Sequence, residues 1–409
     1  MPRQGRANAP CADDSDVHGT SNLMRRSAAR SSFHRAPLHL CEQCARGQVD
    51  APERPRHGPV HQSHMRHEQL QQHIKRLSLS RGLARLCPMT HKRLKRIGMV
   101  GGGAMGCGIA LELAIAGRQV VLYNTRADSS ERARAKLERD ASLLVETGLL
   151  APEQAPAAIG RIRRTTVLAE AAVEQDLVIE SIPEDLALKQ QLFRELDQLA
   201  APDTLLATNT TALSVTAIAR DCTRPERVLS AHYYLPAHLI PLVDIIPGEK
   251  TSPDAVETVR RFIEELGKSP VVFSRDVPGS VGPRLQQALI GEAIRLVHEG
   301  VATPEMVDRV LTQGVGRRLG ASGVFDRLDL VGLDFMTALL RGTGRPVPPV
   351  LAQKVERGEL GQKTGQGFYS WTPESTAAYE ERMARHLATQ LREDRAAGRL
   401  RTPMAELAE

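Results

Sequence analysis

The side chains of this sequence that are best suited to chemistry follow the ends of predicted buried strands. They offer carboxyl, hydroxyl, amide and imidazole groups at Glu184, Thr208, Asn209, Thr210, Thr211 and His232. An imidazole with the ordinary pKa of about 6.5 exchanges a proton near neutral pH, and hydroxyl or amide donors stabilise negative charge that develops on a nearby oxygen. The set predicts proton transfer with a bound substrate. The alternative for His232 alone is a hydrogen-bonded histidine of the core.

The elements that must position these side chains are alternating strands and helices. Apolar, β-branched runs predict strands at 96–100, 119–124 and 242–246, in the stretch 204–215 and in a run that ends at His232. The stretch 176–200 opens as a buried strand and closes as an amphipathic helix. Short connections between such units predict a parallel, doubly wound α/β sheet of the Rossmann type, which binds ligands at the carboxyl ends of its strands.

A glycine-rich loop joins the first two strands. Residues 101–108 read GGGAMGCG, and a helix is predicted to follow at 109–116. The order strand, Gly-x-Gly-x-x-Gly, helix, strand predicts a dinucleotide site, because a tight turn, backbone approach to the pyrophosphate and close helix packing each require a glycine. The alternative is a packing turn without a ligand, and Gly102 and Gly108 are expected to be small for packing in either case. The expected cofactor contacts in this loop are Gly101, Gly103, Ala104, Met105 and Gly106.

The end of the second strand bears on the choice of cofactor. An acidic residue there normally binds the ribose 2′-hydroxyl of NAD, whereas this strand ends in Asn124 and is followed by Thr125 and Arg126. Arg126 is able to pair with a 2′-phosphate. The sequence therefore predicts NAD or NADP, with NADP tolerated and its preference a hypothesis. The alternative is that Asn124 hydrogen-bonds the ribose of NAD.

Composition and charge set the class of protein. The 409 residues are 41% hydrophobic and 25% charged, as in an ordinary globular chain of two or three domains. No apolar run approaches the roughly 20 residues of a membrane helix, and six scattered cysteines favour a reducing compartment such as the cytoplasm. The net charge of +6 arises in residues 1–88, which carry 14 Lys and Arg against 7 Asp and Glu. We therefore expect neither a nucleic-acid partner nor a membrane partner.

Residues 1–88 form a leader of a different kind, rich in Arg, Ser, Pro, Gln and His. Such a composition buries too little apolar surface to fold, so we expect a disordered tail, or an upstream stretch that precedes a natural start at Met89. A transit peptide is a weaker alternative because acidic residues occur early. A zinc site is a further alternative, with the candidate ligands Cys41, Cys44, His57, His61, His64 and His67.

The motifs taken together resemble the 3-hydroxyacyl-CoA dehydrogenase family. The matching stretches, in the family's order between residues 95 and 371, are GGGAMGCGIA, ESIPEDLALKQQLF, TNTTALSV, AHYYLPAHLIPLVDIIPGEKTS, LGKSPVV, DVPGSVGPRL, EAIRLVHEGVAT, VGLD and GQKTGQGFYSW. Carnitine dehydrogenase and the gulonate dehydrogenase/λ-crystallin group share much of this pattern. The resemblance implies an NAD(P)-dependent oxidoreductase that interconverts a 3-hydroxyacyl-CoA and its 3-oxo form in fatty acid metabolism.

The resemblance also implies residue roles. The family's catalytic histidine corresponds to His232, its partner carboxylate to Asp244 and its substrate-binding serine to Thr211. A carboxylate behind the imidazole would fix its tautomer and stabilise the imidazolium. The family residues near the nicotinamide and coenzyme A correspond to Glu184 and Lys189, although a lysine at this place in a helix is commonly a solvated surface residue. Asn209 belongs to the expected cofactor site.

Three residues depart from the family pattern. Leu235 and Pro283 each stand where the family has asparagine, and Asp244 is one methylene shorter than the family's glutamate. Proline has no N–H and no polar side-chain group, so Pro283 cannot replace the amide that helps to hold the substrate carbonyl. A different substrate or a lower activity is therefore a hypothesis.

The pattern turns helical after residue 279, with a further helix start at Thr303-Pro304-Glu305. We expect a leader at 1–88, a cofactor domain at 92–278, an all-α domain at 279–375 that forms a homodimer, and a helical extension at 376–409. The loop GQKTGQGFYSW, with Lys363, is either a packing loop with a solvated lysine or a flap over the active site.

The sequence leaves three functions open. The leading prediction is the acyl-CoA dehydrogenase with His232, Asp244 and Thr211 as its catalytic set and no metal. The second is a dehydrogenase of a 3-hydroxy acid without coenzyme A, such as carnitine or a sugar acid. The third is a cofactor-binding protein without catalysis, which would have no need of that catalytic set.

Overall fold

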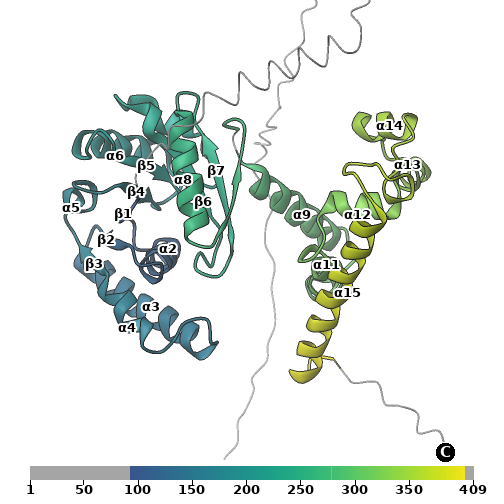
Figure 1. Cartoon of the computed structure of the whole chain (residues 1–409), viewed down its shortest axis with the longest axis horizontal. Coiled ribbons are helices and arrows are strands. Elements are labelled where there is room, and N and C mark those ends of the chain that lie inside the picture. The colour runs from purple at the N-terminus through teal and green to yellow at the C-terminus, as the bar shows by residue number, and fades with distance from the viewer. Residues whose placement is uncertain (1–92, 278, 401–409) are drawn as a thin grey trace, which may run out of the picture. The chain divides into compact units, whose positions relative to one another are not determined.

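The computed structural model describes residues 93–277 and 279–400. The predictions for the leader, including disorder, the start at Met89 and the zinc ligands, lie outside the described residues. The described chain comprises a sheet region, residues 93–277, and a helical region, residues 279–400 (Figure 1).

The sheet region contains one sheet of eight strands in the order β3-β2-β1-β4-β5-β6-β7-β8. The first strand, RIGMV, is buried over its last four residues, as expected for a central strand covered on both faces. The strands are β1 (Arg96–Val100), β2 (Gln119–Tyr123), β3 (Ile162–Thr165), β4 (Leu177–Glu180), β5 (Leu205–Thr208), β6 (Val228–Tyr233), β7 (Leu242–Pro247) and β8 (Ser269–Val272).

The predicted Rossmann-type sheet is confirmed, but the sheet is not wholly parallel. Strands β1 to β6 run parallel to one another, β7 pairs antiparallel with β6, and β8 runs parallel to β7. The connection between β6 and β7 covers only residues 234–241, whereas a parallel crossover needs about a dozen residues or more. The predicted parallel arrangement therefore holds for β1 to β6, and the short connection reverses the chain direction at β7.

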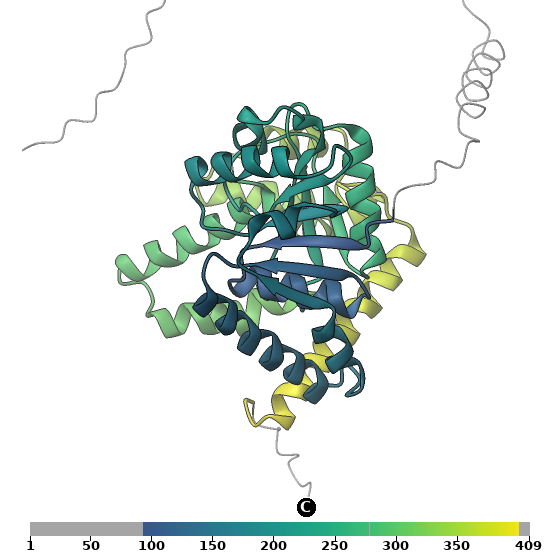
Figure 2. The ribbon, with the colours of Figure 1, turned by 90° about the vertical axis from the view of Figure 1, so that its left-hand side faces the viewer.

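Helices cover both faces of the sheet (Figure 2). One core includes side chains of α2, α3 and α8, and the other includes side chains of α5, α6 and α7. The helices of this region are α2 (Ala104–Ile115), α3 (Ala127–Glu146), α4 (Gln154–Gly160), α5 (Leu168–Ala172), α6 (Leu186–Leu199), α7 (Val215–Ile218) and α8 (Pro253–Glu265), with the short turns η1 (Ala219–Asp221) and η2 (Pro225–Arg227).

Helix α2 begins earlier than predicted. The apolar run predicts a helix from residue 109, whereas the helix begins at Ala104, inside the glycine loop. Nine successive residues of α2, from Gly106 to Ala114, are buried. A helix that is buried nearly all round has no polar face by which its start could be located.

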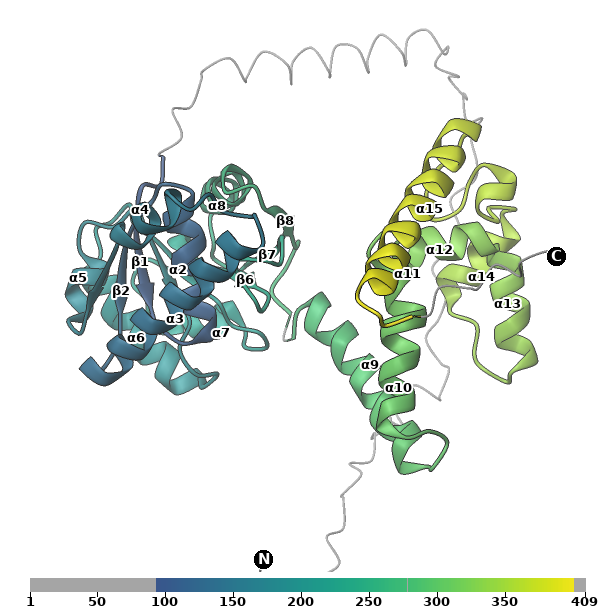
Figure 3. The same cartoon turned by 90° about the horizontal axis from the view of Figure 1, so that it is seen from below.

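The helical region contains helices and no long strand among its described residues (Figure 3). Thr303 caps α10 as predicted, since its hydroxyl accepts a hydrogen bond from the Met306 N–H. The elements are α9 (Val281–His298), α10 (Pro304–Val310), η3 (Leu311–Val315), α11 (Gly316–Leu319), α12 (Val324–Val331), α13 (Leu333–Gly342), α14 (Pro349–Glu356), η4 (Gln362–Thr364) and α15 (Pro373–Ala396).

The loop GQKTGQGFYSW is held inside the helical region by Asp329 of α12. The buried Asp329 carboxylate accepts hydrogen bonds from the backbone N–H groups of Phe368 and Tyr369 and from the Trp371 indole, each at 2.9 Å. Lys363 pairs with Asp334 at the surface. These contacts are the ones expected of a packing loop. The alternative, a flap over the active site, stays a prediction.

Among the described residues, no helix is both long and apolar enough to span a membrane.

Candidate active site

The glycine loop makes a turn that side chains would obstruct. Gly101 has φ +105°, and a Cβ on it would lie 2.4 Å from the Ser181 carbonyl oxygen at the end of β4. A Cβ on Gly106 would lie 1.7 Å from the carbonyl oxygen of Gly101. The first turn of α2 therefore lies directly against the end of β1, which only glycine at both positions permits.

The start of α2 has the features that a pyrophosphate requires. Gly103 is the N-cap, and a Cβ placed there would meet no atom within 4 Å. The first internal hydrogen bond runs from the Cys107 N–H to the Gly103 carbonyl, so the N–H groups of residues 104–106 point away from the helix without intrahelical partners. Open space, free N–H groups and the positive end of a helix fit the phosphates of NAD.

Glycine is needed at positions 102 and 108 because neighbouring residues leave little room for a Cβ. A Cβ on Gly102 would lie 2.4 Å from the Asn124 side chain, and one on Gly108 would lie 3.2 Å from Ala237 and 3.1 Å from His238. Both glycines allow close packing within the protein, as the sequence predicts.

Asn124 and Arg126 follow β2, but only one of them is exposed. Asn124 is buried beneath the loop, and its Oδ1 has no hydrogen-bond partner among the described residues. Arg126 lies at the surface, where its Nε is 3.1 Å from Asp128 Oδ1. The Asp128 carboxylate reduces the positive charge that Arg126 offers to a 2′-phosphate, so the preference for NADP stays a prediction.

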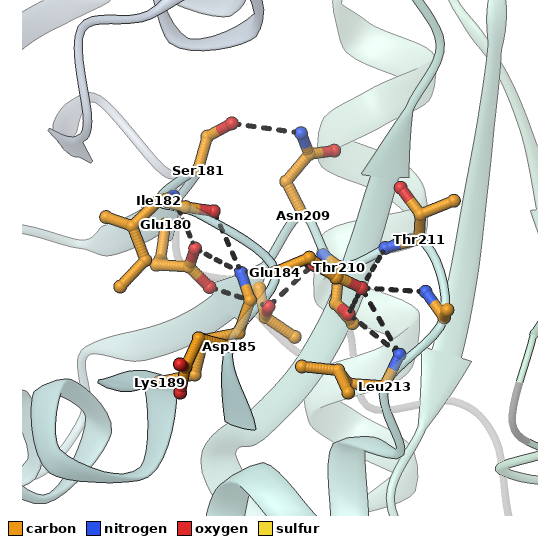
Figure 4. A network of polar contacts seen from close by, with 12 residues as sticks. Glu180, Ser181, Ile182, Glu184, Asp185, Lys189, Asn209, Thr210, Thr211 and Leu213 are labelled. Carbon is orange, nitrogen blue, oxygen red and sulfur yellow. Dashed lines mark hydrogen bonds and ion pairs between the residues drawn. The ribbon is translucent and has the colours of Figure 1, made fainter. Parts of the chain in front are cut away.

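Lys189 lies inside the sheet region (Figure 4). Its side chain is 1% exposed, and its Nζ donates to Glu180 Oε1 at 2.5 Å and lies 3.6 Å from Glu184 Oε2. The interpretation of Lys189 as a solvated surface lysine was wrong, because Glu180, a fully buried carboxylate at the end of β4, holds its ammonium in the core. The Lys189 ammonium lies next to Glu184, and a role for Lys189 near the nicotinamide or coenzyme A stays a prediction.

Glu184 fixes the loop that follows β5. Its Oε1 accepts hydrogen bonds from the Thr210 hydroxyl at 2.5 Å, the Thr211 N–H at 3.0 Å and the Ala212 N–H at 2.8 Å (Figure 4). Burial alone would raise the pKa of Glu184, but these hydrogen bonds and the charge of Lys189 outweigh it and lower the pKa. An ionised Glu184 thus orders the loop and leaves the exposed Thr211 hydroxyl available to a ligand.

Asn209 connects that loop to the neighbouring strands. Its Nδ2 donates to the Ser181 hydroxyl at 3.2 Å, and its Oδ1 accepts from the Tyr233 N–H at 2.7 Å. The ends of β4, β5 and β6 are therefore joined, which brings the strand-end polar residues together as the sequence predicts.

His232 and Asp244 are cross-strand partners in β6 and β7. Their side chains are 6% and 3% exposed, and His232 Nδ1 lies 3.5 Å from Asp244 Oδ2. The antiparallel turn between the strands explains how residues twelve apart in the chain come to face each other. A carboxylate at Nδ1 leaves Nε2 as the ring nitrogen for a substrate.

Two polar residues of the site were missed by sequence reasoning. Glu180 anchors Lys189, and the Tyr234 hydroxyl donates to Asp244 Oδ2 at 2.6 Å. The signal for Tyr234 was its place two residues after His232, which puts both side chains on one face of the extended chain.

Neither of the two residues that replace a family asparagine supplies a substitute amide. Leu235 is 62% exposed, whereas Pro283 is buried in the first turn of α9. A first-turn residue has no intrahelical acceptor for its N–H, so Pro283 fits this helix without loss of a hydrogen bond.

Comparisons with known families cover both regions. The profile described as "3-hydroxyacyl-CoA dehydrogenase, NAD binding domain" matches residues 96–277. The profile described as "3-hydroxyacyl-CoA dehydrogenase, C-terminal domain" matches residues 279–371. The first match identifies the dinucleotide as NAD.

The relatives do not all have the same named activity. The 5-formyl-3-hydroxy-2-methylpyridine 4-carboxylate 5-dehydrogenase of Mesorhizobium japonicum is 36% identical over 72% of this chain and 96% of its own length. A probable 3-hydroxybutyryl-CoA dehydrogenase of Deinococcus radiodurans is 36% identical over 68% of this chain and 100% of its own.

Solved structures agree with these matches. The 3-hydroxyacyl-CoA dehydrogenase of Archaeoglobus fulgidus is 33% identical, covers 73% of this chain and 98% of its own, and superposes with a TM-score of 0.60. A 5-formyl-3-hydroxy-2-methylpyridine 4-carboxylic acid 5-dehydrogenase, described as an NAD+-dependent dismutase, is 34% identical over 73% of this chain and 97% of its own, with a TM-score of 0.58. The chain belongs to the 3-hydroxyacyl-CoA dehydrogenase family, whose members are NAD-dependent oxidoreductases of CH–OH groups.

Proposed function

We propose that this protein interconverts a 3-hydroxyacyl-CoA and the corresponding 3-oxoacyl-CoA with NAD. The observation that carries the proposal is the cross-strand pair of His232 and Asp244, whose strand β6 is joined by Asn209 to the loop ordered by Glu184. Removal of hydride from a secondary alcohol requires its hydroxyl proton to leave, and the imidazole is the group in this cluster that accepts a proton near neutral pH.

Each residue then has a defined task. On oxidation, His232 Nε2 takes the hydroxyl proton, and on reduction it returns that proton to the carbonyl oxygen. Asp244 orients the ring and stabilises the imidazolium, while the Thr211 hydroxyl donates to the reacting oxygen. The free N–H groups of residues 104–106 hold the pyrophosphate, and the bound NAD supplies the hydride acceptor.

The acyl-CoA substrate rests on the family rather than on a coenzyme A contact in the chain. Lys189 is buried, and Leu235 and Pro283 replace the family's asparagines. A hydroxy or oxo carboxylic acid without coenzyme A is therefore the second candidate, and the relative named for a pyridine carboxylate favours it.

A side-by-side assay separates the two candidates. NADH oxidation is followed with acetoacetyl-CoA, free acetoacetate and dehydrocarnitine, and NADH formation from NAD is followed with the formyl pyridine carboxylate. Each reaction is repeated with NADPH or NADP. Turnover confined to acetoacetyl-CoA supports the proposal. Turnover of a free acid alone overturns it in favour of the second candidate, and a preference for NADPH would revive the hypothesis drawn from Asn124 and Arg126.

The variant His232→Ala distinguishes catalysis from cofactor binding alone. We expect it to lose at least about 10³-fold in kcat, because no other group in the cluster replaces the base, while its affinity for NADH stays near that of the wild type. Undiminished turnover would exclude the proposed proton transfer. Cofactor binding without turnover in the wild type itself would favour the non-catalytic function.

We also propose a homodimer formed through the helical region, and a helical domain that includes α15. The Tyr379 hydroxyl of α15 lies 2.9 Å from the Ser322 hydroxyl, and Tyr379 stacks edge-on against Trp371 at 5.7 Å. These contacts tie α15 to the part of the chain that the family profile covers.

A further inference from the structure

One oxygen of Asp244 is shared by two side chains. The Tyr234 hydroxyl donates to Asp244 Oδ2 at 2.6 Å, and His232 Nδ1 lies 3.5 Å from the same oxygen. The rings of His232 and Tyr234 are 4.7 Å apart between centroids, at 59°. Tyr234 therefore touches both members of the pair.

The two contacts differ in strength. A distance of 2.6 Å is that of a strong hydroxyl–carboxylate hydrogen bond, whereas 3.5 Å lies outside the usual range for an imidazole N–H and a carboxylate oxygen. The aspartate is also one methylene shorter than the glutamate that the family resemblance implies at this position. The position of the carboxylate is therefore determined mainly by Tyr234.

We propose that Tyr234 is a positioning residue: its hydroxyl anchors Asp244 Oδ2 and limits how strongly that carboxylate attracts a proton on His232. The proposal rests on the proton-transfer role given to His232 under the proposed function. A hydrogen bond donated to a carboxylate stabilises its negative charge and weakens its pull on a neighbouring cation. Tyr234 thereby competes with the imidazole of His232 for Asp244 Oδ2.

Tyr234 remains a donor throughout the working range of pH. Burial is the main cause that raises the pKa of its phenol above the ordinary value, and the hydrogen bond to Asp244 and the charge of Asp244 raise it further. The shared proton therefore stays on the tyrosine, and the carboxylate stays the acceptor.

Strands β6 and β7, which carry His232 and Asp244, pack against β5, β8, α7 and α8. Strands β5 and β8 and helix α7 carry no titratable group, and Asp244 is the only one in β7. Tyr233 alternates with His232 along β6, and the Lys268 ammonium lies over its ring. Lys268 also pairs with Glu112, and burial raises the pKa of Glu112 to about 7. The charged residues of α8, among them Glu257, Arg260 and Arg261, pair with one another, while its buried face is apolar.

The test is a direct titration of His232 in the full-length protein. The imidazole resonances of ¹⁵N-histidine-labelled protein are followed by NMR from pH 5 to 9, and His232 is assigned by its loss in His232→Gln. We expect Tyr234→Phe to raise the pKa of His232 by about half a unit to one unit, because the freed carboxylate stabilises the imidazolium more strongly.

The matched control is Tyr233→Phe, in the adjacent residue. The Tyr233 hydroxyl is buried and has no hydrogen-bond partner among the described residues, so its removal should leave the His232 titration unchanged. A Tyr234→Phe titration within about 0.2 units of the wild type would overturn the proposal, as would equal shifts in both variants.

A second measurement tests the link with the length of the carboxylate. Asp244→Glu should impair turnover more in the wild-type background than in Tyr234→Phe, because the longer side chain then no longer competes with the hydroxyl for space. A coupling below about threefold in kcat would contradict the anchoring role. The titration requires no substrate, so failure of the acyl-CoA assay and failure of this proposal are distinguishable.

Discussion

Single carboxylates that accept several donors order the loops of this molecule, and Asp197 on α6 is the one whose titration is most informative. Its side chain accepts from Arg227 Nη2 and from the Thr223 N–H, each at 2.7 Å, and from the Thr223 hydroxyl at 2.5 Å. Burial raises the pKa of Asp197, but the hydrogen bonds from Thr223 and Arg227 outweigh it and lower the pKa to about 2.

The lowered pKa makes a prediction about acid stability. A carboxylate whose folded-state pKa is depressed stabilises the fold above its unfolded pKa, near 4, and loses that contribution as the pH falls towards 2. Asp197→Asn should therefore lower the free energy of unfolding at pH 7 by about 2 kcal/mol and flatten its decline between pH 4 and 2. Urea unfolding over this pH range measures both effects.

The control for this prediction lies on the same helix. Glu195 is exposed on α6, so Glu195→Gln should change the free energy of unfolding by less than about 0.5 kcal/mol. Equal losses in the two variants would show that the Asp197 contacts contribute nothing specific.

Single residues also show where sequence reasoning succeeds and where it stops. His232 could be predicted because a strand end and an imidazole are both visible in the sequence. The hydrogen bond from Tyr234 to Asp244 could not be predicted, because it depends on the cross-strand register and on the length of one side chain. The burial of Lys189 could not be predicted, and the alternative of a surface lysine arose because its buried partner, Glu180, lies in a different element.

Among the elements, the start of α2 gives a test of cofactor binding that is separate from stability. Gly103 has open space around its Cα, whereas Gly101 and Gly106 do not. Gly103→Ala should fold normally yet raise the KM for NADH by about tenfold or more, because the methyl group occupies the space through which the phosphates approach.

The matched variant is Gly160→Ala at the end of α4, where a Cβ also meets no atom within 4 Å. Thermal melting and steady-state kinetics are measured for both proteins. If Gly103→Ala bound NADH as the wild type does, the pyrophosphate would have to lie elsewhere.

The loop closed by Asp329 gives a second prediction for an element. Asp329→Asn replaces an acceptor oxygen by an N–H₂ group that faces the N–H donors of residues 368–371. We expect a loss of about 2–3 kcal/mol in the free energy of unfolding, because buried donors are left without acceptors.

Asp334→Asn, in the exposed pair with Lys363, is the comparison and should cost less than about 1 kcal/mol. Urea denaturation measures both variants. A smaller effect at Asp329 than at Asp334 would mean that the loop is held by other contacts.

The elements themselves were predictable where their signal is local. The glycine loop, β1, β2 and the Thr303 cap follow from nearby residues, and the structure confirms them. The reversed direction of β7 and β8 was missed although the short connection at 234–241 carried the signal. The start of α2 was missed because a wholly buried helix has no amphipathic pattern.

At the scale of the whole molecule, helices α9 and α10 of the helical region carry exposed apolar side chains. Leu285, Ile294, Met306 and Val310, all on α9 and α10, are between 57% and 64% exposed. A groove of about 310 Å³ lies between these helices and is lined by apolar side chains that include Leu289, Leu296 and Val307. Apolar surface of this extent on a globular protein commonly marks an interface.

A second copy of the chain is the partner that we propose, and a charge introduced at the exposed Ile294 of α9 tests it. Ile294→Glu should convert a dimer into monomers at micromolar concentration, since a twofold interface would bury two unpaired carboxylates. Size-exclusion chromatography with light scattering gives the mass, and Leu149→Glu, at a 66% exposed leucine of the sheet region, is the matched control. A monomeric wild type, or a dimer that survives Ile294→Glu but not Leu149→Glu, would place the interface elsewhere.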